Sequence, residues 1–230
     1  MWAGWVRDRL GEAGLGEAQE VRTLRLFGMG ESQVAHLLGE GLLRATNPIV
    51  ATYARADAVD VRISAVDADR TARELADEAE AQVLAAVGSH VWARGHTTWP
   101  EVLQAALEAR DWTLALAESG TAGSVTTLLG GMSALRRAES RGGPPPQVRG
   151  GRGIAERLAA DVAATTGADV GLAVIARERR ANLLVTIAIR TPDVTVSERR
   201  VMFAGGAPGR AQAALSAADA LRRVLVSGGP

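Results

Sequence analysis

Apolar residues recur along the chain with two different periods, and together these periods predict a mixed α/β protein. Residues 59–65 alternate apolar and polar side chains, as expected for a strand with one buried face. Residues 32–43 instead place Val34, Leu37 and Leu38 at helical spacing, which predicts an amphipathic helix. We therefore expect sheets that are covered by helices.

The first part of the chain predicts a small α+β domain at residues 21–95. Its expected elements are strand, helix, strand, strand, helix and strand, at residues 23–26, 32–43, 49–53, 59–65, 68–87 and 90–92. Before this domain, Trp2, Trp5 and Leu10 share one helical face, which predicts a helix within residues 1–20. This helix either packs on the domain that follows or forms a dimer contact through its tryptophans.

The second part, residues 96–230, predicts a larger α/β domain whose sheet is covered by helices. Thr98 caps the entry helix, Pro100 lies in its first turn, and Gly167 ends a later helix. The expected helices lie at residues 99–110, 124–129, 154–166 and 210–226, and the expected strands at residues 113–117, 170–175, 183–189 and 194–203. Glycine and proline are concentrated at residues 141–153, so we predict a loop between the second and third of these helices.

One stretch, residues 112–124, carries the pattern of an anion site. A short apolar strand leads into a glycine-containing turn, and a helix begins at Ser124. Backbone N–H groups at a helix start point outward without partners and attract negative charge. The hydroxyls of Ser119, Thr121 and Ser124 surround the same turn, which suits a phosphate group. An ordinary turn at the end of a parallel strand is the alternative, because it has the same composition.

Two familiar motifs do not describe this turn. A P-loop needs a lysine after its last glycine, and the chain has no lysine. A nucleophile elbow has the form Gly-x-Ser-x-Gly, but Ala117 occupies the position of the first glycine. Neither a nucleoside triphosphatase nor an α/β-hydrolase is therefore indicated.

Composition narrows the functions further. The 26 basic and 26 acidic residues cancel, so no net charge attracts the chain to nucleic acid or to an anionic membrane. No apolar run reaches the about 18 residues that span a bilayer, and we expect a cytoplasmic protein. Cysteine is absent, and His90 and His96 are too few for a metal site, so we expect no metal.

Residues 117–123 resemble the signature of a known protein family. The sequence Ala-Glu-Ser-Gly-Thr-Ala-Gly resembles the Ala-Glu-Ser-Cys-Thr-Gly-Gly signature of the CinA family of competence/damage-inducible proteins. Residues 96–103 resemble the segment that precedes this signature, and residues 22–32 and 47–54 resemble an earlier part of the family. The matches follow the family's order and cover most of the chain from about residue 20 onward.

The resemblance implies a domain organisation. Full-length members look like an N-terminal molybdopterin-binding-like domain, a small KH-like domain and a C-terminal α/β domain. Residues 21–95 would be the KH-like domain, residues 96–230 the C-terminal domain, and residues 1–20 a remnant of the last helix of the first domain, which this chain otherwise lacks. Gly28-Met29-Gly30 is one residue short of the Gly-x-x-Gly loop that clamps RNA, so nucleic-acid binding is not expected.

The resemblance also implies a chemistry. The family's C-terminal domain converts nicotinamide mononucleotide and water to nicotinate mononucleotide and ammonia, without a cofactor. By carry-over Ser119 is the nucleophile, and a pyridine mononucleotide is the ligand. The substrate-binding positions that follow from the motif and from the final helix are Glu118, Gly120, Thr121, Gly123, Ser124 and Arg210. We also expect a homodimer.

Two departures from the family pattern argue against efficient catalysis. The family has a tyrosine and a lysine on a strand after the serine turn, where this chain has the glycine- and proline-rich loop, and residues 176–181 form a hairpin in place of a Thr-Gly-Ile-Ala-Gly-Pro loop. Lysine, tyrosine, histidine and cysteine are absent after His96, and Glu118 is expected on the opposite face of its strand from Ser119. The chain is thus either an amidohydrolase with weak or lost activity, or a non-catalytic module for nucleotide binding or oligomerisation.

Overall fold

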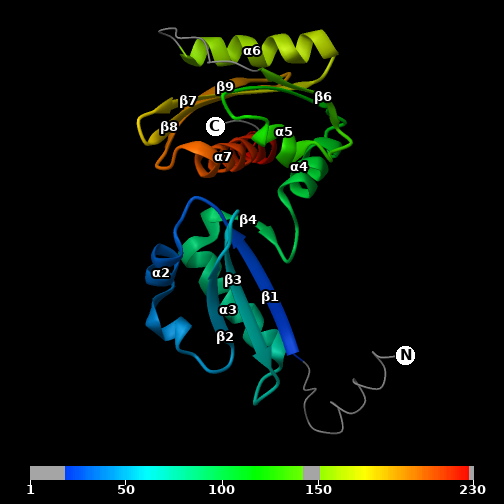
Figure 1. Ribbon diagram of the computed structural model, residues 1–230. Coiled ribbons are helices and arrows are strands. Elements are labelled where there is room, and N and C mark those ends of the chain that lie inside the picture. Colours follow the sequence, from blue (N-terminus) through cyan, green and yellow to red (C-terminus); the bar gives the residue numbers. More distant parts are fainter. Residues whose placement is uncertain (1–18, 142–150, 228–230) are drawn as a thin grey trace, which may run out of the picture. The chain divides into compact units, whose positions relative to one another are not determined.

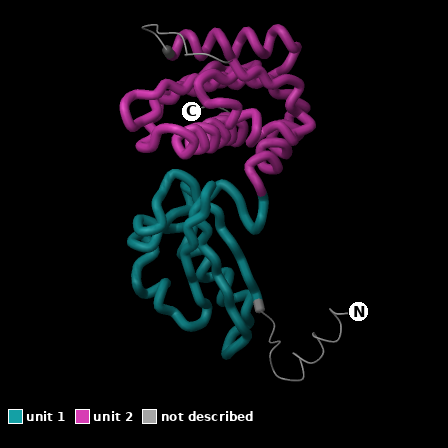
Figure 2. Tube along the Cα trace, in the orientation of Figure 1, with its two compact units in different colours: residues 1–97 teal, residues 98–230 magenta. Residues whose placement is uncertain are grey.

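The computed structural model describes residues 19–141 and 151–227, and the chain divides into two units, residues 1–97 and 98–230 (Figure 2). Residues 1–18 of the predicted first helix lie outside the described residues, as do residues 142–150 of the predicted loop. The sequence predicts that residues 19 and 20 belong to the first helix, but the structure places them in the first strand.

Unit 1 is built on a four-stranded antiparallel sheet with the order β2-β3-β1-β4 (Figure 1). The elements follow the predicted order, and they are β1 (Gln19–Leu26), α2 (Glu31–Leu43), β2 (Ile49–Ala54), β3 (Val59–Val66), α3 (Ala72–Val87), a short 3₁₀ helix (Gly88–His90) and β4 (Val91–Arg94). Thr71 and Glu74 form a capping box at the start of α3, which begins four residues later than predicted.

The two helices of unit 1 cover one face of its sheet. Alternate residues of the strands, such as Leu24 and Val61, share a single apolar core with Val34 of α2 and with Ala76 and Val83 of α3. The other face carries Arg25 and Arg62 among its side chains, as the alternating pattern of β3 predicts. No helix of unit 1 that the structure describes packs on this second face.

Unit 2 contains a five-stranded mixed sheet with the order β6-β5-β7-β8-β9. Its elements are α4 (Trp99–Glu108), β5 (Leu114–Ser119), α5 (Ser124–Leu129), β6 (Leu135–Arg141), α6 (Gly151–Thr166), β7 (Val170–Arg179), β8 (Asn182–Arg190), β9 (Thr195–Met202) and α7 (Gly206–Ser227). Strand β5 pairs in parallel with both β6 and β7, whereas β8 and β9 add antiparallel strands.

Helices lie on both faces of this sheet, as the sequence predicts. Figure 1 shows α6 on one face and α4, α5 and α7 on the other. Ala115 and Ala117 of β5 pack with Ala155 and Leu158 of α6 in one buried cluster. Because side chains alternate along a strand, the residues between them face α5 and α7.

Two predictions for the region between residues 130 and 153 are wrong. Residues 135–141 form the edge strand β6 instead of a loop, and residues 151–153 already belong to α6. Edge strand β6 is held by its backbone pairing to β5, so its polar and exposed side chains leave little hydrophobic pattern to detect. The predicted hairpin at residues 176–181 is confirmed, with Arg180 at its tip in the left-handed conformation.

None of the described helices is both long enough and apolar enough to cross a membrane.

Candidate functional site

Strand β5 ends at Ser119, in the middle of the parallel part of the sheet. Ser119 lies opposite Arg141 of β6 and Ile175 of β7, and only 7% of its surface is exposed. Ligand sites of open α/β sheets commonly lie beyond the carboxyl ends of parallel strands. The position of Ser119 is therefore the one where a small-molecule site is expected.

The start of β5 is fixed to the start of β7 by a short hydrogen-bond network. Thr113 donates its backbone N–H and its hydroxyl to Asp169, each over 2.8 Å. These bonds lower the pKa of the Asp169 carboxyl, because they favour its charged form. The network sets the register of the two strands that carry Ser119 and Ile175.

Gly120 is required by the packing of the turn that follows Ser119. Its φ is +76°, and a Cβ atom built on it would lie 2.0 Å from the carbonyl oxygen of Ala176 in β7. The absence of a side chain at Gly120 therefore makes room for the backbone of β7, not for a ligand. Gly123, at φ +80°, has no atom within 4 Å of such a Cβ, so its glycine serves the left-handed backbone at the start of α5.

Glu118 is completely buried and caps the start of α5 with its carboxylate. The backbone N–H groups of Val125 and Thr126 donate to it over 3.1 and 3.0 Å, and the hydroxyls of Thr121 and Thr126 donate as well. This is the arrangement that a helix dipole and unpaired N–H groups favour. The helix start is therefore not the open anion site that the sequence predicts, because the chain's own carboxylate fills it.

The remaining donors of this helix start also have partners. Ser124 donates its N–H and its hydroxyl to the carbonyl oxygen of Thr121, over 3.2 and 2.8 Å, and Thr127 N–H donates to Gly123. The predicted binding residues Glu118, Thr121 and Ser124 are thus brought together, but in bonds to one another and to α5. Sequence patterns locate these residues, yet they do not reveal this internal pairing.

Ser119 points to the opposite face of the sheet from Glu118, as expected from strand alternation. Its neighbours Ala117 and Ile175 belong to the cluster under α6, whereas Glu118 binds α5 on the other face. Among the described residues no side chain forms a hydrogen bond with Ser119 Oγ. Arg210 lies in α7, also on the face away from α6, where it pairs with Glu178 over 3.5 Å.

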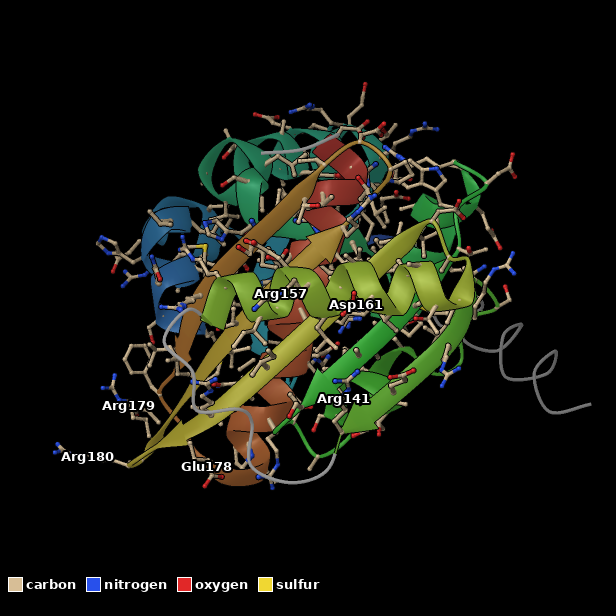
Figure 3. All side chains as sticks on the ribbon, turned by 90° about the horizontal axis from the view of Figure 1, so that it is seen from above. Arg141, Arg157, Asp161, Glu178, Arg179 and Arg180 are labelled. Carbon is tan, nitrogen blue, oxygen red and sulfur yellow. The ribbon has the colours of Figure 1, made fainter. Side chains whose placement is uncertain are left out.

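Two charged residues next to Ser119 were not found from the sequence, because β6 was predicted as a loop. Arg141, which Figure 3 labels on β6, is paired directly with Ser119. Glu139 lies two residues earlier in β6, so it is on the same face of the strand. Glu139 forms ion pairs with Arg137 over 2.8 Å and with Arg141 over 3.7 Å. Its carboxylate is thus on the Ser119 face but is already engaged by arginines.

Metal ligands do not gather in the described parts of the chain. No group of three or more His, Cys, Asp or Glu residues is placed there to hold an ion. His90, the one histidine with a defined contact, lies 3.1 Å through Nδ1 from the carbonyl oxygen of Phe27. Its ring therefore joins the 3₁₀ helix to the loop after β1.

Comparison with known proteins defines the class of the chain. Residues 21–93 match the model of the damage-inducible protein CinA KH domain. A CinA-like protein of Deinococcus deserti is 38% identical over 172 residues, which are 69% of this chain and 42% of the relative. A CinA-like protein of Thermomicrobium roseum is 32% identical over 237 residues, covering 98% of this chain and 58% of that protein.

The chain belongs to the CinA family. It spans about half the length of these curated relatives. Among solved structures, a competence or damage-inducible protein of Enterobacter asburiae aligns with 56% of this chain and 99% of its own, at 17% identity and a TM-score of 0.45.

Proposed function

We propose that unit 2 is a nicotinamide-nucleotide amidohydrolase domain in which catalysis by Ser119 is strongly reduced or lost. The observation that carries this proposal is the position of Ser119: it ends the central parallel strand but has no hydrogen-bonded proton acceptor among the described residues. The CinA-type sequence of the turn supplies the substrate class, a pyridine mononucleotide.

The proposed reaction is hydrolysis of a carboxamide. Ser119 Oγ attacks the carboxamide carbon, the C–N bond breaks, and ammonia leaves with the proton of the hydroxyl. Water then cleaves the acyl-serine ester and releases the carboxylate product. A serine hydroxyl is a weak nucleophile at neutral pH, so both steps need a base within hydrogen-bond reach.

The candidate bases in unit 2 are poorly arranged for this task. Glu118 accepts hydrogen bonds at the start of α5, on the other face of the sheet. Glu139 shares the face of Ser119 but is held by Arg137 and Arg141. The sequence after His96 has no lysine, tyrosine, histidine or cysteine. General-base help contributes roughly 10²–10⁴-fold, so we expect its loss to slow the reaction by about that factor.

In this proposal, the hydrogen-bonded side chains of the turn between β5 and α5 maintain the shape of that turn. Glu118, Thr121 and Ser124 are engaged with α5, so we assign them to holding the turn rather than to contact with the ligand. Arg141 is paired directly with Ser119, so it is the arginine of this face that we assign to the phosphate of a mononucleotide.

Ammonia release from nicotinamide mononucleotide tests the proposal. Starting from a typical turnover of about 10 s⁻¹, loss of the base predicts about 10⁻³ to 10⁻¹ s⁻¹ for the wild type, and less for Ser119→Ala. Ser140→Ala is the matched control, because Ser140 lies opposite Glu118 on the other face. A wild-type rate near 10 s⁻¹ would contradict the proposal that activity is reduced. Equal slow rates in wild type and Ser119→Ala would show that Ser119 does not catalyse the reaction and would favour a non-catalytic module.

A further inference from the structure

The uncovered face of the sheet in unit 1 forms a pocket of about 540 Å³. Its walls include Thr23, Arg25, Tyr53, Arg55, Asp60 and Arg62. The volume lies within the range of about 300–1,000 Å³ that is typical of small-molecule sites. The pocket is made by unit 1 residues and does not involve the Ser119 turn.

Strand pairing explains why these side chains meet. Arg62 of β3 lies opposite Thr23 of β1 and Ala51 of β2, and Asp60 lies opposite Tyr53. Directly paired residues project from the same face of a sheet, and so do residues two apart on one strand. Tyr53 and Arg62 are therefore diagonal neighbours on the uncovered face.

The acidic groups at the pocket, Asp57 and Asp60, are already paired with arginines. Arg25 binds Asp57 through Nη2 over 2.8 Å and Asp60 through Nε over 3.3 Å, and it also donates to the carbonyl oxygen of Thr97. Asp60 accepts a further bond from Nε of Arg55, over 3.0 Å. Asp60 and Arg25 are thus a nearly buried, satisfied pair that forms the floor of the pocket.

Two other arginines keep donors for a ligand. Arg55 uses only Nε in its bond to Asp60, and its guanidinium lies 5.8 Å from the centre of the Tyr53 ring. Arg62 is exposed, and no acidic residue within the described part of the chain forms an ion pair with it. Guanidinium groups bind phosphate oxygens with paired N–H donors, so these two groups suit a phosphate.

Tyr53 adds a flat surface beside these cations. It is the one tyrosine of the chain, and 44% of its surface is exposed. Aromatic rings of this kind stack on nucleobases of any sequence, because every base has a flat face. Its position next to Arg55 and Arg62 places a stacking surface beside an anion-binding pair.

We propose that this pocket binds a free mononucleotide, with its phosphate on Arg55 and Arg62 and its ring against Tyr53. Among the described residues, Tyr53 and His96 are the ring-bearing residues that line the pocket, and its volume is that of a single small ligand rather than of a strand of bases. The chain has zero net charge, so it lacks the general attraction that supports nucleic-acid binding. A single phosphorylated ring matches both the charge and the volume.

Binding of AMP to the full chain, measured by calorimetry, tests this inference. Removing a charge-assisted hydrogen bond costs about 1.5–3 kcal/mol, so Arg62→Gln should weaken AMP binding by about tenfold or more. Tyr53→Leu should also weaken it, because the stacking surface is lost. Adenosine and inorganic phosphate should each bind at least about tenfold more weakly than AMP, since each makes only part of the contacts.

Arg73→Gln is the matched control, because Arg73 is an exposed arginine of α3, and α3 covers the opposite face of the sheet. It should leave AMP affinity unchanged, and thermal unfolding of Arg62→Gln should match the wild type. Equal AMP affinity in wild type and Arg62→Gln, or no AMP binding at millimolar concentration, would overturn the proposal. Preference for a single-stranded decanucleotide over AMP by more than about tenfold would do so too, by identifying nucleic acid as the occupant.

Discussion

The carboxylate of Glu118 and the hydroxyl of Ser119 leave β5 on opposite faces of the sheet in unit 2. Glu118 binds the start of α5, and Ser119 lies in the row of residues under α6. Consecutive residues of a strand cannot share a face. Glu118, the nearest carboxylate in sequence, therefore cannot deprotonate Ser119 while both residues remain paired within the sheet. The same pairing gives Glu118 a structural task that can be tested by itself.

Replacement of Glu118 by alanine should strongly destabilise unit 2. The change leaves two backbone N–H groups and two hydroxyls at the start of α5 without their acceptor. An unsatisfied buried group costs about 1–3 kcal/mol, so we expect a loss of about 3 kcal/mol or more in the free energy of unfolding. Denaturant unfolding measures it.

Glu178→Ala provides the comparison for this substitution. Glu178 is exposed and forms one ion pair with Arg210 over 3.5 Å, so its loss should change stability by less than about 1 kcal/mol. If Glu118→Ala were as stable as Glu178→Ala but failed to bind nicotinamide mononucleotide, Glu118 would be a ligand-binding group and not a helix cap.

The sequence predicts the elements of both units well where their hydrophobic pattern is strong. Helix α5 begins and ends where predicted, because Gly123 and the apolar residues of 124–129 mark it clearly. Strand β6 was missed, because an edge strand needs backbone pairing and not an apolar face. Its omission also hid Glu139 and Arg141, the charged residues of β6 that share the face of Ser119.

The sequence also does not show which side chains bond to one another. The pattern at residues 117–124 indicates an anion at a helix start, and the structure contains one, but it is the carboxylate of Glu118. Whether a helix start is open depends on how the turn folds back. Here Gly120 lies against the carbonyl oxygen of Ala176, which belongs to the neighbouring strand of the sheet but is far away in the sequence. Such a contact is not encoded in any local spacing.

Glu139→Gln should leave the rate of ammonia release within about twofold of the wild type. The carboxylate is held by Arg137 and Arg141, so it is not expected to accept a proton from Ser119. The measurement is ammonia release from saturating nicotinamide mononucleotide. A fall of about 100-fold or more would instead identify Glu139 as the general base.

Alanine at Gly120 should destabilise the protein more than alanine at Gly123. Both glycines have positive φ, for which a side chain costs about 1–2 kcal/mol. Only at Gly120 would the new Cβ also collide with a backbone carbonyl, at 2.0 Å from Ala176. We expect a loss of about 1 kcal/mol for Gly123→Ala and at least twice that for Gly120→Ala, measured by denaturant unfolding. Equal losses would show that the approach of β7 does not depend on Gly120.

Asp169 should make part of the stability of unit 2 sensitive to acid. Hydrogen bonds from Thr113 hold the pKa of the Asp169 carboxyl below its value in the unfolded chain, which is about 3.9. The folded state therefore gains stability from the charged form above the unfolded pKa, and loses it as the pH falls through the lower folded pKa.

Asp169→Asn removes this dependence, and it should lower the free energy of unfolding by about 1–2 kcal/mol at pH 7. The difference between wild type and variant should shrink as the pH is lowered from 5 to 3, because protonation takes the stabilising charge from the wild type as well. Unfolding free energies at several pH values in this window measure the effect. A difference that stays constant down to pH 3 would mean that the bonds between Thr113 and Asp169 do not favour the charged carboxyl.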